Sequence, residues 1–245
     1  MKWILLVAIV ITAASCKSVT YFRKLSKEEQ AIIKQFSKQI KPNDQYHVLV
    51  MTDMGNMVVK LYNETPLHRD NFISKVKAGF YDSLMFHRVI NNFMIQGGDP
   101  TSKKALAGQS LGSGSAPGER IPAEFRTEQN IYHKRGALAA ARDGNPEKAS
   151  SNCQFYIVHR KPWRVSQLDS AIVSRRLTLN DEQKKLYTTT GGTPHLDGGY
   201  MVYGELEIGF DVLDKIAATK TLPGDRPEKD VRMKMFVLAE PKAKK

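Results

Sequence analysis

Patterns typical of metal or nucleotide binding are missing from this 245-residue sequence. Its six histidines and two cysteines show no spacing like that of zinc ligands, such as two histidines four positions apart on a helix. The glycine-rich run at residues 112–114 lacks the Gly-Lys-Ser/Thr ending of a phosphate-binding loop. Cys153 has no histidine near it in sequence, which favours a small residue at the edge of the core over a nucleophile. We therefore expect no metal site and no cofactor.

Hydrophobic runs long enough to span a membrane are also missing. The apolar run Trp3 to Ile11 is too short for a bilayer about 30 Å thick, which needs about 20 residues. It follows Lys2, and small residues precede Cys16, so residues 1–15 are similar to a bacterial lipoprotein signal peptide with Ala13 in place of the usual leucine. A cleaved secretory signal or a buried N-terminal strand are the alternative interpretations.

The lipoprotein interpretation predicts where the protein is found. Cys16 becomes the acylated N-terminus, and two or three acyl chains anchor stably because each buried methylene contributes about 0.8 kcal/mol. Lys17, in place of an aspartate after the cysteine, indicates the outer membrane by the sorting rules of this class. We expect a lipid-anchored protein of the cell envelope that faces the periplasm. With Cys16 acylated, Cys153 has no intramolecular disulfide partner.

Acidic residues are too few to balance the basic ones, and the formal net charge is +12. A basic excess can indicate binding to nucleic acid or to an anionic membrane surface. Here the excess is spread along the chain, with only a short lysine-rich run in the tail at 241–245. Since an exported protein rarely meets nucleic acid, we expect a solvated basic surface and no nucleic-acid partner. We also expect a monomer.

A helix is predicted after a short tether, within residues 16–45. Ser26 and Glu29 form a capping box at its start. Its apolar stripe recurs every four residues, at Ile32, Phe36 and Ile40. The helix is expected to pack on the domain that follows, with partner binding as the alternative.

The domain from residue 46 to 240 consists mostly of short predicted strands. A hairpin pairs residues 46–52 with 57–62, and the last strand covers 232–239. Two amphipathic helices interrupt the strands, one over 66–78 after a Thr65 cap and one over 209–218. Short strands with only two covering helices favour a mainly β fold, an antiparallel barrel that is closed.

The most informative stretch is FHRVINNFMIQGGD, from Phe86 to Asp99. Two apolar-rich strands, 86–90 and 93–96, flank the turn residues Asn91 and Asn92. One face of this hairpin is expected to carry a fixed cation, an amide and an apolar wall side by side. These residues are Arg88, Gln96, Phe93 and Met94.

This stretch resembles the signature of the cyclophilin family of peptidyl-prolyl cis-trans isomerases. Three further blocks resemble the next family motifs in the right order: GALAAAR from Gly136, SSNCQFYIV from Ser150 and HLDGGYMVYGE from His195. The resemblance covers roughly residues 46–239. It implies an eight-stranded closed antiparallel barrel capped by two helices, and isomerisation of X-Pro bonds without a cofactor.

The resemblance also implies the roles of individual residues. Arg88 matches the catalytic donor, and Gln96 matches the amide that binds substrate backbone and helps to orient the arginine. The wall of the proline pocket matches Phe93, Met94, Tyr156 and Leu196. Ala141 and Gln154 match positions that line the groove for residues preceding proline.

Three substrate-binding positions differ from the pattern of animal family members. His195 stands where they have tryptophan, Tyr200 where they have histidine, and Arg142 where they have asparagine. His195 offers less apolar area at the rim, so we expect weak binding of cyclosporin. Arg142 replaces a group that contacts substrate backbone, which leaves the preference for the residue before proline open.

Residues 160–194 form an insertion relative to short family members. Residues 166–176 and 180–188 are predicted to form two short helices. The insertion is either a structural brace or a lid over the pocket, and its apolar residues favour the brace.

Two functions fit the sequence. The first is a prolyl isomerase that acts on proteins of the cell envelope and aids their folding. The second is a lipid-anchored chaperone or binding module in which isomerase activity is incidental or lost. The retained Arg88, Phe93, Met94 and Gln96 favour the isomerase.

Overall fold

The computed structural model describes residues 25–41 and 43–241. The predicted signal peptide, Cys16 and the lysines of the C-terminal tail lie outside the described residues. None of the helices in the described part has the length and apolar character needed to cross a bilayer.

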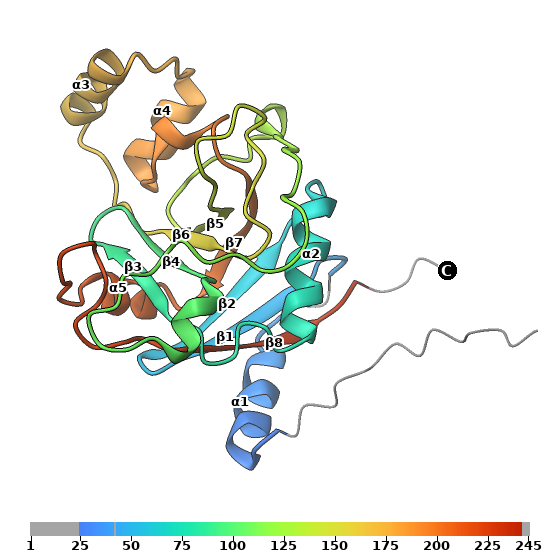
Figure 1. Ribbon diagram of the computed structural model, residues 1–245. Coiled ribbons are helices and arrows are strands. Elements are labelled where there is room, and N and C mark those ends of the chain that lie inside the picture. Colours follow the sequence, from blue (N-terminus) through green and yellow to red (C-terminus); the bar gives the residue numbers. More distant parts are fainter. Residues whose placement is uncertain (1–24, 42, 242–245) are drawn as a thin grey trace, which may run out of the picture.

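Eight antiparallel strands form one curved sheet, an open half-barrel with the order β3-β4-β6-β5-β7-β2-β1-β8 (Figure 1). The strands begin and end within two residues of the predicted bounds where a strand was predicted. They are β1 (His47–Thr52), β2 (Gly55–Leu61), β3 (Phe86–Ile90), β4 (Met94–Gly97), β5 (Ala137–Ala140), β6 (Phe155–Val158), β7 (Val202–Ile208) and β8 (Met233–Ala239).

The prediction of a closed barrel is wrong, because β3 and β8 are the two edges of the sheet. In the described residues, the segments around these edges meet through an isolated bridge between Met85 and Arg232 and a few adjacent main-chain hydrogen bonds, not through a strand ladder. Further along β3, the Val89 N–H donates to the carbonyl of Asp225 at 2.8 Å. The loop before β8 is therefore hydrogen-bonded to the edge strand β3 at this point.

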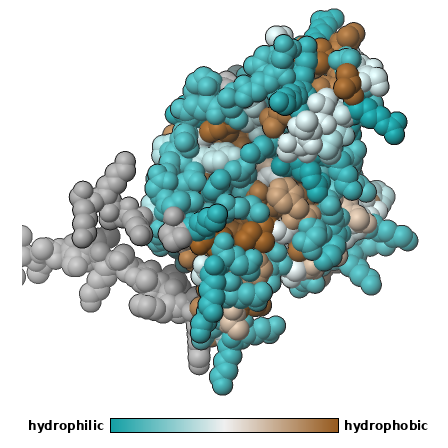
Figure 2. Space-filling view, turned by 180° about the vertical axis from the view of Figure 1, so that it is seen from behind, coloured by the Kyte–Doolittle hydropathy of each residue, from teal (hydrophilic) through white to brown (hydrophobic). Residues whose placement is uncertain are grey.

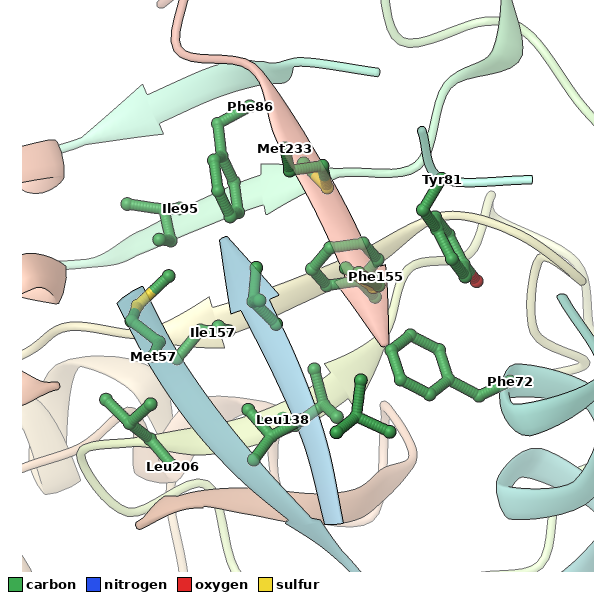
Figure 3. Packing of buried hydrophobic residues seen from close by; sticks show 14 of the residues in the cluster. Met57, Phe72, Tyr81, Phe86, Ile95, Leu138, Phe155, Ile157, Leu206 and Met233 are labelled. Atoms are coloured by element: carbon green, nitrogen blue, oxygen red, sulfur yellow. The ribbon is translucent and has the colours of Figure 1, made fainter. Parts of the chain in front are cut away.

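The main hydrophobic core fills the concave side of the sheet (Figure 3). At its centre the Phe155 ring contacts Phe72, Tyr81 and Phe86 edge-on, at centroid distances of 5.8, 5.6 and 6.1 Å. Such edge-to-face pairs are the favoured geometry for aromatic rings. Phe155 belongs to the same strand as Tyr156, so this core also supports the outer face of the sheet.

Two helices cover opposite ends of the half-barrel, as predicted (Figure 1). In α2 (Pro66–Lys77), Thr65 is the N-cap residue, but its side chain makes no capping hydrogen bond, which corrects the predicted cap. In α5 (Phe210–Ala217) the residues that face the sheet are buried, among them Leu213 and Ile216. Phe210 is 37% exposed and lies beside the Arg135 guanidinium, outside this buried face.

The N-terminal helix α1 (Lys27–Ser37) packs on the convex side of the sheet, against residues of β1, β2 and β8. Its capping box forms as predicted: Glu29 N donates to Ser26 Oγ at 3.1 Å, and Ser26 N donates to the Glu29 carboxylate at 2.8 Å. The helix ends at Ser37, before Ile40, yet Ile40 is still buried in the same cluster.

The insertion forms two helices, α3 (Val165–Arg175) and α4 (Asp181–Thr189), within one residue of the predicted bounds. They stand apart from the sheet at the upper left of Figure 1. Leu168 and Tyr187 are buried against Tyr132 of the main domain. The opposite view of the molecule shows a mostly hydrophilic surface with scattered apolar areas (Figure 2).

Candidate active site

The candidate site lies on the convex face of β4 and β6, opposite the main core. Side chains alternate along a strand, so Ile95 and Ile157 join the core while their neighbours point outward. The ladder aligns Gln96 with Tyr156, and Met94 lies one residue beyond Ile95 on the same outer face. A pattern of period two thus gives each strand one face for stability and one for binding.

A pocket of about 190 Å³ opens on this face. Nine of the eleven residues assigned to catalysis and substrate binding line it, although they come from four separate parts of the sequence. They are Arg88, Phe93, Met94, Gln96, Ala141, Arg142, Tyr156, Leu196 and Tyr200. The other two adjoin it: Gln154 accepts a hydrogen bond from Gln96 Nε2 at 3.1 Å, and the His195 ring stacks on Phe93.

Arg88 is paired differently from the prediction. Its Nε donates to Asp225 Oδ2 at 3.2 Å, and in the described residues it makes no hydrogen bond to Gln96. Gln96 is engaged with Gln154, so it orients that amide and not the arginine. A carboxylate is also the stronger partner for a guanidinium, because the hydrogen bond is charge-assisted on both sides.

A groove of about 740 Å³ continues from the pocket and shares Gln96, Ala141 and Arg142 with it. Gln154 also lines the groove, and its Nε2 donates to the carbonyls of Gly112 and Gly114 at 3.0 and 2.7 Å. These contacts fix the groove wall opposite the strand.

Just after β4, the backbone at Gly98 approaches residues 153 and 154 closely. Gly98 has a φ of +95°, and a Cβ there would lie 2.2 Å from the Cys153 carbonyl oxygen, so only glycine fits. Cys153 itself is buried, and burial raises the pKa of its thiol, as expected for a residue of the core edge.

Arg142 is held against the boundary between pocket and groove. Its Nε donates to the Gly199 carbonyl at 2.7 Å, and its guanidinium lies 4.8 Å from the centre of the Tyr200 ring. Two of the departures from the family pattern, Arg142 and Tyr200, thus contact each other and form one wall.

His195 forms an uncharged rim at neutral pH. Its ring stacks on Phe93 with a centroid distance of 5.9 Å and an interplanar angle of 22°. Burial, followed by the positive charge of Arg175, lowers the pKa of His195 to about 4. A neutral imidazole over an aromatic ring can serve as an apolar edge of the pocket.

Comparison with known proteins agrees with this geometry. The family model described as "Cyclophilin type peptidyl-prolyl cis-trans isomerase/CLD" matches residues 47–237, which is most of the chain. The chain belongs to the cyclophilin family of peptidyl-prolyl cis-trans isomerases. The family and the isomerase activity predicted from the four sequence blocks are confirmed.

Bacterial proteins and solved structures are similar to this protein over most of its length. A Staphylococcus saprophyticus protein named as a peptidyl-prolyl cis-trans isomerase is 35% identical over 210 residues, covering 84% of this chain and 98% of that protein. A Streptococcus pyogenes protein named as a bifunctional phosphatase and isomerase is 37% identical over 189 residues, but the chain spans only 37% of it. A Cryptosporidium parvum cyclophilin shares the fold with a TM-score of 0.60 and 23% identity, covering 80% and 99% of the two chains.

A hydrogen-bonded chain under the pocket was not predicted from the sequence of this cyclophilin. The Tyr156 hydroxyl and His133 Nε2 lie 2.9 Å apart, as do His133 Nδ1 and Asp197 Oδ1. The Tyr187 hydroxyl of α4 donates to the second oxygen of Asp197. Because an ionised carboxylate only accepts, His133 Nδ1 donates to Asp197 and its Nε2 accepts from Tyr156. These hydrogen bonds therefore connect the insertion to the wall of the pocket.

Replacing Tyr187 with phenylalanine is expected to loosen that wall. One hydrogen bond to a carboxylate that is only 10% exposed is lost, which should lower the free energy of unfolding by about 1–3 kcal/mol and raise KM several-fold with little change in kcat. Urea denaturation and peptide isomerisation kinetics measure the two effects.

Tyr132→Phe is the matched control for Tyr187→Phe. Tyr132 packs in the same apolar cluster as Tyr187, but its hydroxyl donates to Asn130. It therefore takes no part in the hydrogen bonds that lead to the pocket. A KM that rises equally in both variants would contradict the link.

His87 is buried in the structure and only 3% exposed. Neither ring nitrogen has a hydrogen-bond partner in the described residues. Burial lowers the pKa of His87 from 6.5 to about 4. It therefore stays neutral through the physiological range and is unsuited to acting as a base there.

This buried histidine predicts a loss of stability in acid. His87 binds a proton near pH 6.5 in the unfolded protein but only near pH 4 in the folded one. The contribution of neutral His87 to the free energy of unfolding is therefore fully present above pH 6.5 and is lost as the pH falls towards 4. His87→Phe should remove about 2–3 kcal/mol of this decline at pH 4.5. Urea denaturation of both proteins at pH 7 and 4.5 checks it, since the difference at pH 7 reports packing alone. Equal declines in the two proteins would contradict the assignment.

Proposed function

We propose that this cyclophilin isomerises X-Pro bonds in polypeptides of the cell envelope, with Arg88 as the catalytic donor and a lipid anchor at Cys16. The observation that carries the catalytic part is the pocket itself. It places the guanidinium of Arg88 beside an apolar wall of Phe93, Met94 and Leu196. The envelope location rests on the sequence of the N-terminal segment.

The reaction needs no nucleophile and no metal. The peptide C–N bond resists rotation with a barrier of about 18–20 kcal/mol, and uncatalysed X-Pro exchange takes tens to hundreds of seconds. A gain of about 10⁵ in rate corresponds to a reduction of the barrier by roughly 7 kcal/mol. The enzyme must therefore bind the twisted amide more tightly than the planar one.

Arg88 can supply that preference. When the amide twists, the prolyl nitrogen regains its lone pair, which a nearby guanidinium stabilises directly or through the proline carbonyl. Arginine keeps its charge at every relevant pH and presents several N–H donors in a rigid plane. The strand position of Arg88 and its ion pair with Asp225 limit where this plane can lie.

The rest of the pocket holds the substrate while one side of the bond rotates. The apolar wall of Phe93, Met94, Tyr156 and Leu196 fits a proline ring. Gln96, which is held by Gln154, presents its amide to the substrate backbone, and the groove next to it accommodates the residues before proline. A solved structure of the C. parvum cyclophilin was obtained in the presence of the dipeptide Ala-Pro, which supports a proline-containing substrate here.

NMR exchange spectroscopy on a short Ala-Pro peptide tests the catalytic proposal. The purified protein is expected to accelerate exchange between the cis and trans peaks by several orders of magnitude over the peptide alone. Peptide binding without acceleration would contradict the isomerase proposal and favour a binding module.

The proposed lipid anchor at Cys16 can be tested separately. Cys16→Ala should move the protein from the membrane fraction to the soluble fraction and abolish incorporation of labelled fatty acid, because the acyl chains supply the membrane affinity. Fractionation of cells that express the full chain measures both effects. Cys153→Ala is the control, since Cys153 is buried in the folded domain. A Cys16→Ala protein that stays in the membrane would rule out the lipid anchor.

A further inference from the structure

An ion pair joins the catalytic arginine to a loop far away in the sequence. Arg88 lies in β3, and Asp225 lies in the loop between α5 and β8. Arg88 Nε donates to Asp225 Oδ2 at 3.2 Å, and no other ion pair of Arg88 forms within residues 43–241. The carboxylate thus takes the Nε side of the guanidinium and leaves the two Nη groups available to the pocket that Arg88 lines.

The backbone of Asp225 is fixed relative to the arginine. Its carbonyl accepts from Val89 N at 2.8 Å, so the residue is hydrogen-bonded to the neighbour of Arg88 in β3. Its own N–H donates to the Leu222 carbonyl at 3.0 Å. Asp225 adopts a φ of +66°, a left-handed conformation that is uncommon outside glycine and asparagine or aspartate. Non-glycine residues in this region cluster at functional sites.

The residue after Asp225 ties the same loop to the body of the protein. The Arg226 side chain is buried and donates from Nη1 to the carbonyls of Leu106 and Gln109, at 2.9 and 2.8 Å. It also pairs with Asp230 at 2.9 Å. The loop is therefore held at both its main chain and a buried side chain, so the Asp225 carboxylate has a defined place.

We propose that Asp225 is a positioning residue that holds the guanidinium plane of Arg88 with its Nη edge towards the substrate amide. This inference rests on the proposed isomerase function. Arginine has a long and flexible side chain, and a donor that is fixed before the substrate binds loses no order in the transition state. Arg88 and Asp225 are 43% and 41% exposed, so without the ion pair solvent would leave the guanidinium free to reorient.

Because Arg88 and Asp225 are both exposed, a positioning role of their ion pair can be distinguished from a role in stability. Exposed ion pairs contribute little to the free energy of folding. Asparagine tolerates the left-handed backbone of residue 225 as aspartate does, so removing the carboxylate in Asp225→Asn should leave the melting temperature almost unchanged and act on catalysis. Since Asp225 is not among the residues that line the pocket, the effect should fall on kcat and not on KM.

The test compares the wild-type protein with Asp225→Ala, Asp225→Asn and Asp225→Glu in the peptide exchange assay. Asp225→Ala should lower kcat by about 10- to 100-fold with KM within two-fold. Asp225→Asn should lose less, because its amide oxygen still accepts from Nε, and Asp225→Glu should recover part of the activity. Asp211→Asn is the matched control, because it removes another exposed carboxylate from an ion pair, with Lys215, on α5.

Two further measurements decide the interpretation. In an Arg88→Ala background, Asp225→Ala should cause no further loss, whereas a full additional loss would overturn the proposal. The ¹⁵N NMR signal of the Arg88 Nε–H should exchange slowly with solvent in the wild type and rapidly in Asp225→Ala. A kcat of Asp225→Ala equal to that of the wild type would also overturn the proposal. An inactive wild-type protein would instead contradict the isomerase function, and the NMR signal would still report whether the pair forms.

Discussion

Replacing Arg88 with alanine is expected to lower kcat/KM for an Ala-Pro peptide by about 100- to 1,000-fold, the usual effect of removing one donor that acts on charge developing in the transition state. Arg88 is the only cation of β3 or β4 that lines the pocket. The remaining wall still binds proline, so KM should change less than kcat. Peptide exchange by NMR measures both constants.

Two other substitutions sharpen the Arg88 experiment. Arg88→Lys keeps the charge but loses the planar fork of donors, and it should recover only part of the activity. Arg69→Ala is the matched control, because Arg69 also pairs with an aspartate, Asp70 at 2.7 Å, but lies outside the pocket. If Arg88→Ala kept full activity, the donor mechanism would be wrong. If it lost activity in vitro but kept function in cells, the chaperone alternative would gain support.

Phe155→Ala should be the most destabilising single truncation in the core, lowering the free energy of unfolding by about 3–5 kcal/mol. The ring is 1% exposed and contacts three other aromatic rings, so the residual cavity cannot collapse easily. Domains of ordinary stability have about 5–15 kcal/mol in total, so a large part would be lost. Urea denaturation measures the change.

Phe93→Ala is the matched control for Phe155→Ala. Phe93 is a phenylalanine on the opposite face of the sheet and is only partly buried. Its truncation should weaken peptide binding and change stability little. Equal loss of stability in both variants would contradict the division of the sheet into a core face and a binding face.

Local patterns in the sequence predicted most of the elements. The alternation around Arg88 and Gln96 places these side chains on one outer face, and the structure brings both into the pocket. The capping box at Ser26 and Glu29 predicted the start of α1 because both partners lie within one helical turn. The pocket residues from distant blocks were predicted through the family resemblance, since no periodicity connects residue 88 with residue 196.

Contacts between distant parts of the chain were not predictable in the same way. Nothing local to Asp225 indicates a partner in β3, and a single charged residue in a turn-rich loop is usually solvated. The pairing of Arg88 with Asp225 in place of Gln96 is a consequence of where that loop lies. The same loop is hydrogen-bonded to β3, which is one of the two edges of the sheet.

The hydrogen-bonded chain from Tyr187 to Tyr156 was missed for a similar reason. It joins residues from the insertion, the 133 segment and the 197 segment, and each step depends on the fold. The lack of a side-chain cap at Thr65 is a smaller case, because a threonine before a helix is a good capping residue by type while its backbone here is at φ −123° and ψ 63°.

The pairing of β1 with β8 has a consequence for biosynthesis. These strands are the first and last of the sheet in chain order, yet they are hydrogen-bonded neighbours along the length of β1. A nascent chain leaves the ribosome from its N-terminus, so one edge of β1 stays open until residues 233–239 have emerged. Open strand edges pair readily with other chains. Until β8 has emerged, the open edge of β1 is therefore a site where the nascent chain can pair with other chains.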